Sequence, residues 1–394
     1  RLLSQRKLFS PKAFAPRALF ASCIGMDAGL TILRVGGIDC ATVKDEYFNS
    51  IRRFCNVSDC FLAGNFDFEN LSSGGGKGGD LLSRTLDGKY IVKQLNGCDS
   101  KSLLEKEFLK SYVDLVSSGS SFICKIVAVF LHPKLGNFLA MINCLPTHVE
   151  SWSGIFDVKG TADDKVLVED GTRVPEVHKR CWNLKWMLSE AIGCEKCVPT
   201  QRRRYIAGKK TAYRIPLYVT KDQKVEILNS LDEALTLFEQ YGLMDYSMII
   251  GIFRPPPSTT ASELLRLSSL PNCKAYLSQH CGDTTVIYFG LIDFLQAWTG
   301  AKKCASVMKT CCAPAPISTI SPKKYARQFR KFFQWKLRGV AHDVISSARS
   351  HDSLISSKTA TCTFFDEVDE LKATVGWLHE KLARVESRIT ELEK

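Results

Sequence analysis

Hydrophobic residues recur at helical spacing near the end of the chain. Between residues 364 and 392 their separations alternate between four and three, at Phe364, Val368, Leu371, Val375, Leu378, Leu382, Val385, Ile389 and Leu392. Four heptads of such a narrow apolar seam predict a coiled-coil helix. An amphipathic helix packed on its own domain is the alternative, but the narrow seam favours a partner helix from a second copy or from another protein.

The middle of the chain alternates between strand-like and helix-like hydrophobic patterns. The predicted elements are a strand at 90–92, a helix over 100–116, strands over 123–131 and 138–145, alternating strands and helices over 155–253, and a strand over 285–292. Basic residues at 201–204 and 209–210 interrupt this alternation. The order of elements predicts an α+β fold.

Three other segments lack regular patterning. Interrupted apolar residues in 1–68 predict short helices around a variable loop at 25–37. Residues 254–260 contain three prolines, which remove the donors that a helix or sheet needs, so a solvated loop is predicted. A lysine-bearing loop that includes 311–316 is predicted after the strand over 285–292.

Composition and charge narrow the classes of function. The chain has 394 residues, of which 45% are hydrophobic and 24% charged. This mixture is typical of a globular protein and excludes collagen-like, wholly disordered and small disulfide-stapled classes. Lys and Arg number 53 against 41 Asp and Glu, a net charge of +12. This surplus favours an anionic partner: a nucleotide, a nucleic acid or an acidic membrane face.

Cysteines and apolar runs bear on the compartment. The 16 cysteines are scattered, and no secretory signal pattern opens the chain, so a reducing cytosolic location is predicted. The most apolar long window, 122–131, is interrupted by Lys125 and is too short to span about 30 Å of hydrocarbon. The start at Arg1 suggests a processed product or a fragment. Cys194-x-x-Cys197 lacks a second ligand pair at zinc spacing, so reduced thiols are predicted there.

A glycine-rich segment precedes a lysine-bearing strand. Residues 72–79 read SSGGGKGG, and the following strand ends in IVKQL, which contains Lys93. Glycines let backbone N–H groups approach phosphate oxygens, and a lysine on the next strand can neutralise phosphate charge. Neither Walker A nor G-x-G-x-x-G is matched, and a flexible surface loop is the alternative for the glycines alone.

Aspartates occur at strand-to-loop transitions in three downstream motifs: FDVKGT with Asp157, MDYSMIIG with Asp245 and YFGLIDF with Asp293. A strand end fixes the side chain while the loop admits substrate, which suits a metal-binding or catalytic carboxylate. Each aspartate by itself is more commonly a turn or helix-cap residue. Together with the glycines and Lys93, they favour a phosphoryl-transfer site.

Seven sequence blocks resemble a known family, the phosphatidylinositol phosphate kinases, over about 9–340. The blocks follow the family's order and spacing: GGGKGGDLL with IVKQL, ICKIVAVFLHPKLGNFLAMINCL, FDVKGT, NLKWML, LFEQYGLMDYSMIIGIF, YFGLIDFLQAWTGAKKCASVMK and ISTISPKKYARQFRKFF. The resemblance implies a two-lobed, kinase-like α+β fold. Its implied parts are N-terminal helices with an ATP-binding lobe over 1–145, a catalytic and lipid-binding lobe over 146–345, and a linker with the coiled-coil helix over 346–394.

The resemblance also implies which residues contact ATP. Lys93 stands at the strand lysine that holds the ATP phosphates in this family. Gly75, Gly76, Lys77 and Gly78 stand in the loop that covers the phosphates. Residues 141–145 fall where the family has its adenine-contacting hinge.

Three further residues receive roles by resemblance. Asp245 stands at the catalytic aspartate, which orients the inositol hydroxyl and accepts its proton. Because a carboxylate is a weak base at pH 7, orientation is expected to be its larger role. Asp293 stands at the position that binds Mg²⁺, and Lys159 would add positive charge near the transferred phosphoryl group.

The implied reaction transfers the γ-phosphoryl group of ATP, with Mg²⁺, to the 5-hydroxyl of phosphatidylinositol 4-phosphate. Phosphatidylinositol 3-phosphate is the alternative substrate, because the phosphate loop and IVKQL are at least as similar to the 3-phosphate 5-kinase branch. A weakly active scaffold that binds phosphoinositide membranes is the rival from another class. A nucleic-acid partner is not predicted, since no recognition module accompanies the charge.

Some positions depart from the family pattern. Gly78 replaces a serine of the phosphate loop, Thr161 replaces a serine, and 162–164 read ADD where basic or small polar residues are expected. These changes would fit reduced activity, although the retained lysine and aspartates argue against its loss. The acidic partner of the strand lysine is open, with three candidates: Asp99, Glu105 and Glu107.

In this family, the segment that follows the metal-binding aspartate engages the lipid headgroup and the membrane. Lysines flank the corresponding segment of this chain. The lysines assigned to lipid binding are Lys302, Lys303, Lys323 and Lys324. A solvated face is the alternative. Each basic residue near an anionic leaflet contributes about 1 kcal/mol to membrane binding. We therefore expect a cytoplasmic protein that binds peripherally to the cytosolic face of membranes, and we expect this binding to weaken with salt.

Overall fold

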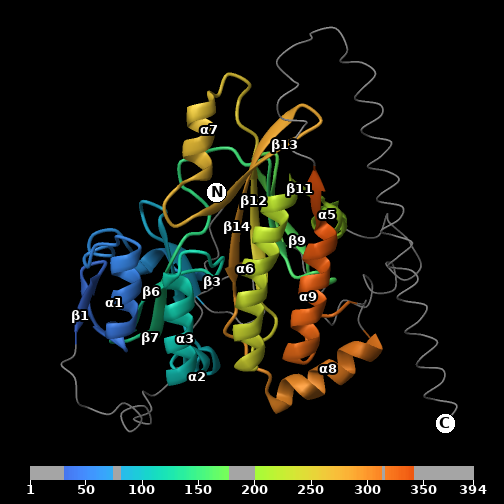
Figure 1. Ribbon diagram of the computed structural model, residues 1–394. Coiled ribbons are helices and arrows are strands. Elements are labelled where there is room, and N and C mark those ends of the chain that lie inside the picture. The colour runs from blue at the N-terminus through green and yellow to red at the C-terminus, as the bar shows by residue number, and fades with distance from the viewer. Residues whose placement is uncertain (1–30, 74–80, 177–199, 313–315, 341–394) are drawn as a thin grey trace, which may run out of the picture.

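The computed structural model describes residues 31–73, 81–176, 200–312 and 316–340 (Figure 1). A seven-stranded sheet and a six-stranded sheet form the framework of the fold, with helices packed around them. This mixture confirms the predicted α+β class. None of the helices in the described ranges is long and apolar enough to cross a membrane. The predicted coiled coil and the Cys-x-x-Cys motif lie outside the described residues.

The first sheet is formed by the N-terminal part of the chain. Its strands, in spatial order, are β1 (Ile32–Val35), β2 (Ile38–Thr42), β6 (Ile126–His132), β7 (Gly136–Ile142), β5 (Tyr90–Gln94), β4 (Leu81–Arg84) and β3 (Ser72–Ser73). Neighbouring strands are antiparallel. Helix α1 (Asp45–Phe54) packs on β6 and on α3 (Lys106–Ser117). The strands predicted at 90–92, 123–131 and 138–145 are confirmed as β5, β6 and β7, with shifted ends.

Two predictions for this part of the chain are wrong. Of the short helices predicted in 1–68, α1 is confirmed, but residues 32–42 form a β-hairpin instead of a helix or loop, because Gly36 and Gly37 supply the positive φ angles of its turn. The single helix predicted over 100–116 is two helices, α2 (Gly97–Leu103) and α3. The side chain of Glu105 accepts the backbone N–H groups at the start of α3, so it begins a new helix.

The second sheet lies in the C-terminal part. Its strands, in spatial order, are β10 (Thr172–Arg173), β9 (Lys165–Glu169), β8 (Gly154–Val158), β12 (Ser247–Phe253), β14 (Asp283–Ile292) and β13 (Lys274–His280). Helices α6 (Lys221–Gln240) and α9 (Pro322–Lys336) run side by side (Figure 1). Strands β11 (Leu217–Thr220) and β15 (Leu337–Val340) pair in parallel. The predicted loop at 254–260 is confirmed, and it leads into α7 (Ala261–Ser268).

Two basic segments are helical where the sequence favoured other structure. The loop predicted after the strand over 285–292 contains helix α8 (Gly300–Cys312). The basic residues at 201–204 lie within helix α5 (Thr200–Arg214), so they do not interrupt regular structure. The local hydrophobic pattern of both segments is weak, and α5 packs against β9 and β8 of the second sheet.

The larger of two hydrophobic clusters among the described residues runs through both sheets, from Leu33 to Leu337. The sheets meet where the segment before β6 reaches β14. Leu291 N–H donates to Phe122 O at 2.8 Å, and Cys124 N–H donates to Leu291 O at 2.9 Å. The end of β14 is therefore fixed against the first sheet. The domain boundaries at 145 and 345 stay predictions.

Candidate phosphoryl-transfer site

Three neighbouring strands of the second sheet end at one edge. Strand β12 lies between β8 and β14 and is antiparallel to both. The residue after β8, the residues before β12 and the residue after β14 therefore meet at the same edge. These positions hold Lys159, Asp245 and Asp293. Strand pairing thus brings together three residues that lie far apart in the sequence, at positions 159, 245 and 293.

Lys159 and Asp245 form a close ion pair at this edge. Lys159 Nζ donates to Asp245 Oδ1 and to Asp245 O, both at 2.7 Å. Their side chains are 17% and 26% exposed. Burial would lower the pKa of Lys159, but the nearby carboxylates of Asp245 and Asp157 outweigh burial and raise it. Lys159 is therefore a fixed cation at neutral pH.

Lys93 and Asp293 form a second pair, which joins the two sheets. Lys93 lies on β5 of the first sheet, and its Nζ donates to Asp293 Oδ1 at 3.1 Å. Burial would raise the pKa of Asp293, but the positive charges of Lys93 and Lys159 outweigh burial and lower it. Asp293 is thus ionised at neutral pH, and its side chain is 50% exposed. This pairing was not among the partners predicted for Lys93, and Glu105 instead caps α3.

Both aspartates have left-handed backbone conformations, with φ of +65° at Asp245 and +56° at Asp293. Such conformations cost about 1 to 3 kcal/mol each, and persist where surrounding contacts impose them. The two loops bind each other here: Met244 N–H donates to Gln296 O, and Trp298 N–H to Gly242 O, each at 2.9 Å. The loops therefore hold the two carboxylates as a unit.

Helix α9 supports the Asp245 loop from behind. The ring of Tyr246 packs against Phe238, Tyr325 and Phe329, with centroids 4.8, 4.7 and 5.2 Å away. The hydroxyl of Tyr325 donates to Tyr246 O. The C-terminal block that contains α9 thus belongs to the packing beneath the site.

The loop after Lys159 contains features that the local sequence pattern does not reveal. Gly160 has φ of +66°, and a Cβ there would lie 2.6 Å from Phe332 Cγ, so only glycine fits. Asp164 is buried, and its Oδ1 accepts the N–H groups of Lys159 and Thr161. In the sequence, Asp164 stands out only as part of the ADD segment that departs from the family pattern.

Asp157 lies at the end of a strand, as predicted: it is the penultimate residue of β8 and is buried, with 7% exposure. Its Oδ2 lies 3.4 Å from Lys165 Nζ, which also lies 2.8 Å from Glu176 Oε1. Lys165 was not predicted. Its signal was a basic residue eight positions after the aspartate of FDVKGT. These three residues add a second charged cluster beside Lys159, because the charge of Asp157 acts on that lysine.

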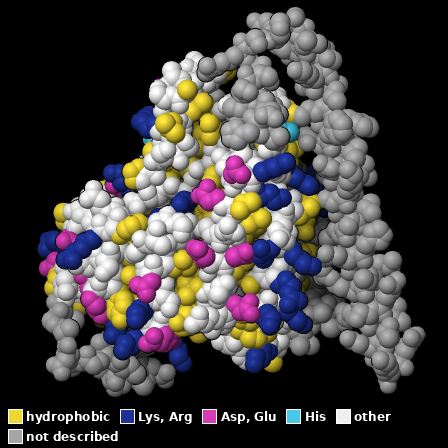
Figure 2. Space-filling model, viewed as in Figure 1, with side chains coloured by type: hydrophobic (Ala, Val, Ile, Leu, Met, Phe, Trp, Pro, Cys, Tyr) yellow, Lys and Arg dark blue, Asp and Glu magenta, His cyan; other side chains and the backbone are white. Residues whose placement is uncertain are grey.

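The other predicted site residues are placed as follows. Gly75, Gly76, Lys77 and Gly78 lie outside the described residues. The four lysines assigned to lipid binding lie on two successive helices: Lys302 and Lys303 near the start of α8, Lys323 and Lys324 at the start of α9. The last three are exposed and Lys302 is half-buried. Figure 2 shows Lys and Arg side chains gathered over α9.

The site suits Mg²⁺ bound together with phosphate. The described ranges contain no cluster of three or more His, Cys, Asp or Glu side chains that could hold a metal by itself. Mg²⁺ is commonly held by one or two carboxylates plus substrate phosphates. The ionised, half-exposed carboxylate of Asp293, between two lysines that attract phosphate, fits that mode.

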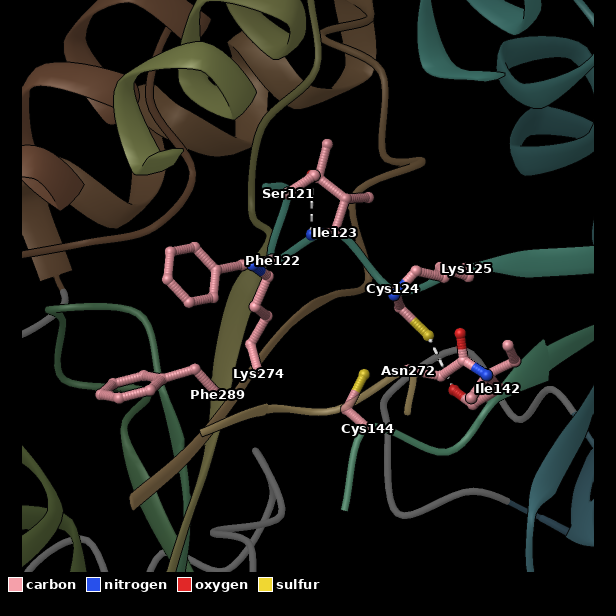
Figure 3. A pocket seen from close by; sticks show the side chains of 10 residues that line it. All are labelled: Ser121, Phe122, Ile123, Cys124, Lys125, Ile142, Cys144, Asn272, Lys274 and Phe289. Carbon is pink, nitrogen blue, oxygen red and sulfur yellow. Dashed lines mark hydrogen bonds between the residues drawn. The ribbon is translucent and has the colours of Figure 1, made fainter. Parts of the chain in front are cut away.

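A small cavity lies between the segment before β6, the start of β13 and the end of β7 (Figure 3). Its volume is about 10 Å³, room for about one water molecule. The thiol of Cys124 donates to Ile142 O at 3.2 Å in its wall. The cavity is too small for an adenine ring, and the adenine-contacting role of 141–145 stays a prediction.

Comparisons with known proteins bear on this geometry. A family profile described as Phosphatidylinositol-4-phosphate 5-Kinase matches residues 64–276 and 257–335, more than half of the chain. The chain is 21% identical over 325 residues to 1-phosphatidylinositol 3-phosphate 5-kinase FAB1 of Saccharomyces cerevisiae, covering 77% of this chain and 12% of that protein. It is 23% identical over 345 residues to Phosphatidylinositol 4-phosphate 5-kinase 6 of Arabidopsis thaliana, covering 72% and 44%. The chain thus spans less than half the length of these relatives.

Proposed function

The chain belongs to the phosphatidylinositol phosphate kinase family, and on that premise we propose that it transfers the γ-phosphoryl group of ATP to the 5-hydroxyl of phosphatidylinositol 4-phosphate. The products are phosphatidylinositol 4,5-bisphosphate, ADP and a proton. The observation that carries the proposal is the convergence of two lysines and two aspartates, Lys93, Lys159, Asp245 and Asp293, at one edge between the sheets. Phosphoryl transfer depends on positioning and on neutralising spread negative charge, and this set of charges supplies both.

Each residue has a proposed part in the reaction. Lys93 and Lys159 place fixed positive charge against the phosphates and stabilise the charge of the transition state. Asp245 orients the inositol hydroxyl and takes its proton as the oxygen attacks the γ-phosphorus and the bond to the bridging oxygen breaks. Asp293 would hold Mg²⁺, which neutralises phosphate charge when bound. The existing ion pairs hold these side chains before substrate arrives, which reduces the entropy cost of reaction.

The lipid is proposed to reach the site from a membrane surface. Lys303, Lys323 and Lys324 are exposed at the starts of α8 and α9. Each would contribute about 1 kcal/mol near an anionic leaflet, so binding would be transient and salt-sensitive. Self-association through the heptads over 364–392 is part of the same proposal, because it would double the number of membrane contacts.

Phosphatidylinositol 3-phosphate is a second candidate substrate. The relative from Saccharomyces cerevisiae is named a 3-phosphate 5-kinase and the relative from Arabidopsis thaliana a 4-phosphate 5-kinase, and the identities are similar, at 21% and 23%. A weakly active scaffold is the remaining alternative.

One assay separates these candidates. The purified chain is incubated with radiolabelled ATP, Mg²⁺ and vesicles that carry phosphatidylinositol 4-phosphate or the 3-phosphate, and the headgroup products are separated. The 4,5-bisphosphate is the expected product; the 3,5-bisphosphate alone would favour the alternative substrate. Vesicle binding without any product would favour the scaffold.

A matched pair of variants checks that the product comes from this site. Asp293→Asn should abolish transfer. Asp283→Asn should retain it, because Asp283 begins the same strand, is exposed, and lies 3.5 Å from Arg254. Equal product from wild type and Asp293→Asn would overturn the proposal.

A further inference from the structure

A buried carboxylate holds the backbone of the residue that carries the Lys159 amine. Asp164 is 0% exposed. Its Oδ1 accepts the backbone N–H of Lys159 at 2.7 Å and that of Thr161 at 3.1 Å. The N–H of Asp164 donates in turn to Thr161 O at 3.2 Å. The side chain of Asp164, at the end of the turn, therefore holds the backbone of Lys159 at its beginning.

Other contacts hold the apex of the turn but not Lys159. Ala162 N–H donates to Pro316 O at 3.0 Å, and Lys209 Nζ of α5 donates to Ala162 O at 2.8 Å. The hydroxyl of Ser318 donates to Asp163 Oδ2 at 3.2 Å. The two neighbouring aspartates thus have different partners, which makes Asp163 a matched control for Asp164.

The two carboxyl oxygens of Asp164 differ in their hydrogen bonding. Asp164 Oδ2 has no hydrogen-bond partner within the described ranges, whereas Oδ1 accepts both N–H groups of the Lys159 turn. A buried carboxylate needs a nearby positive charge. Lys336 at the end of α9 is the buried basic residue whose charge acts on Asp164: it is 1% exposed, burial lowers its own pKa, and its Nζ donates to Ala212 O at 2.8 Å.

We propose that Asp164 is a positioning residue that holds the Lys159 amine against Asp245 through the backbone of Lys159. The inference rests on the proposed function, because it takes Lys159 as a cation of the phosphoryl-transfer site. The lysine stem is flexible, so the amine reaches Asp245 reproducibly only when its backbone is fixed. A misplacement of about 1 Å at such a site can cost about 100-fold in rate.

Two substitutions at this position separate the hydrogen bonds from the charge. Asp164→Leu has a similar size and suits a buried site, but it has no acceptor. Asp164→Asn keeps an acceptor oxygen for both N–H groups. Asp164→Leu is expected to lower kcat about 10- to 100-fold with little change in the KM for lipid. Asp164→Asn should restore most of the rate, and Asp163→Asn should stay near wild type.

A chemical readout tests the position of Lys159 without using activity. Acetic anhydride labels lysine amines, and peptide mass spectrometry gives the labelling rate of Lys159 in each variant. Labelling should be faster in Asp164→Leu than in wild type, Asp164→Asn or Asp163→Asn. If this order holds while wild type makes no phosphoinositide product, the proposed function fails but the positioning role stands. Unchanged kcat and labelling in Asp164→Leu would overturn the positioning role.

Wild-type protein gives a test if Asp164→Leu does not fold. Hydrogen exchange at the Lys159 and Thr161 amides should be strongly protected, because both donate to a buried carboxylate. Exchange as fast as that of exposed loop amides would overturn the inference.

Discussion

Substituting Gly160 tests how tightly the Lys159 loop is packed against α9. Gly160 has φ of +66°, and a Cβ built on it would lie 2.6 Å from Phe332 Cγ and 2.7 Å from Phe332 Cβ. In Gly160→Ala the left-handed backbone costs about 1 to 2 kcal/mol, and overpacking a buried site costs about 1 to 3 kcal/mol more. The free energy of unfolding should therefore fall by about 2 to 5 kcal/mol relative to wild type.

Gly64→Ala is the matched control for backbone strain. Gly64 has φ of +67°, and a Cβ there would meet nothing within 4 Å. This variant should lose only the strain contribution of about 1 to 2 kcal/mol. Urea denaturation followed by tryptophan fluorescence measures both variants, and phosphoryl transfer is assayed in parallel. If Gly160→Ala is no less stable than Gly64→Ala, the reasoning about the contact with Phe332 is refuted.

Three further perturbations have defined outcomes. Arg52→Met should lower the free energy of unfolding by about 3 to 5 kcal/mol, because it leaves Asp45 without a guanidinium that is 5% exposed and donates to both of its oxygens at 2.9 Å. Tyr325→Phe should cost about 1 to 3 kcal/mol, because Tyr246 O loses its donor. Burial, with a smaller contribution from the charge of Asp157, raises the pKa of Asp164 from 3.8 to about 7 against the opposing charge of Lys336, so its contribution to stability is present below about pH 4 and is lost as pH rises towards 7. Asp164→Asn should therefore gain on wild type between pH 4 and 8, by at most about 4 kcal/mol.

Urea titrations at 25 °C check all three. An Arg52→Met variant as stable as Arg34→Met, which breaks an exposed pair with Asp39, would contradict the first. Wild-type stability in Tyr325→Phe would contradict the second. For the third, the titrations are repeated at pH 5 and pH 8, and an equal gap at both would show that Asp164 does not titrate in that range.

Local sequence pattern predicted strands well where apolar runs are long. The central residues of β14 are buried on both faces, which gives the sequence a continuous apolar run. The predicted start at 285 is therefore close to the observed start at Asp283. The prediction of a single helix over 100–116 was wrong because Glu105 caps a new helix. The sequence does not reveal this cap, because glutamate is equally common inside helices. Helix α8 was missed because its lysines and cysteines have no clear apolar stripe.

Some residues of the candidate site could be predicted from the sequence, and others could not. Strand ends and motif resemblance pointed to Lys93, Asp245 and Asp293, which the structure brings together, although their catalytic roles stay predictions. The pairing of Lys93 with Asp293 joins residues 200 positions apart and depends on how the two sheets meet. Asp164 was visible as an unusual acid, but its role follows from burial, which a local pattern does not contain.

One nucleotide and one metal ion are proposed to bind at the junction of the two sheets. Titration calorimetry of ATP, with and without Mg²⁺, tests this proposal most directly in wild type, Asp293→Asn and the control Asp283→Asn. We predict that Mg²⁺ strengthens ATP binding to wild type and to Asp283→Asn, and that Asp293→Asn loses this increment while still binding ATP through Lys93. An undiminished effect of Mg²⁺ in Asp293→Asn would contradict the assignment of this site.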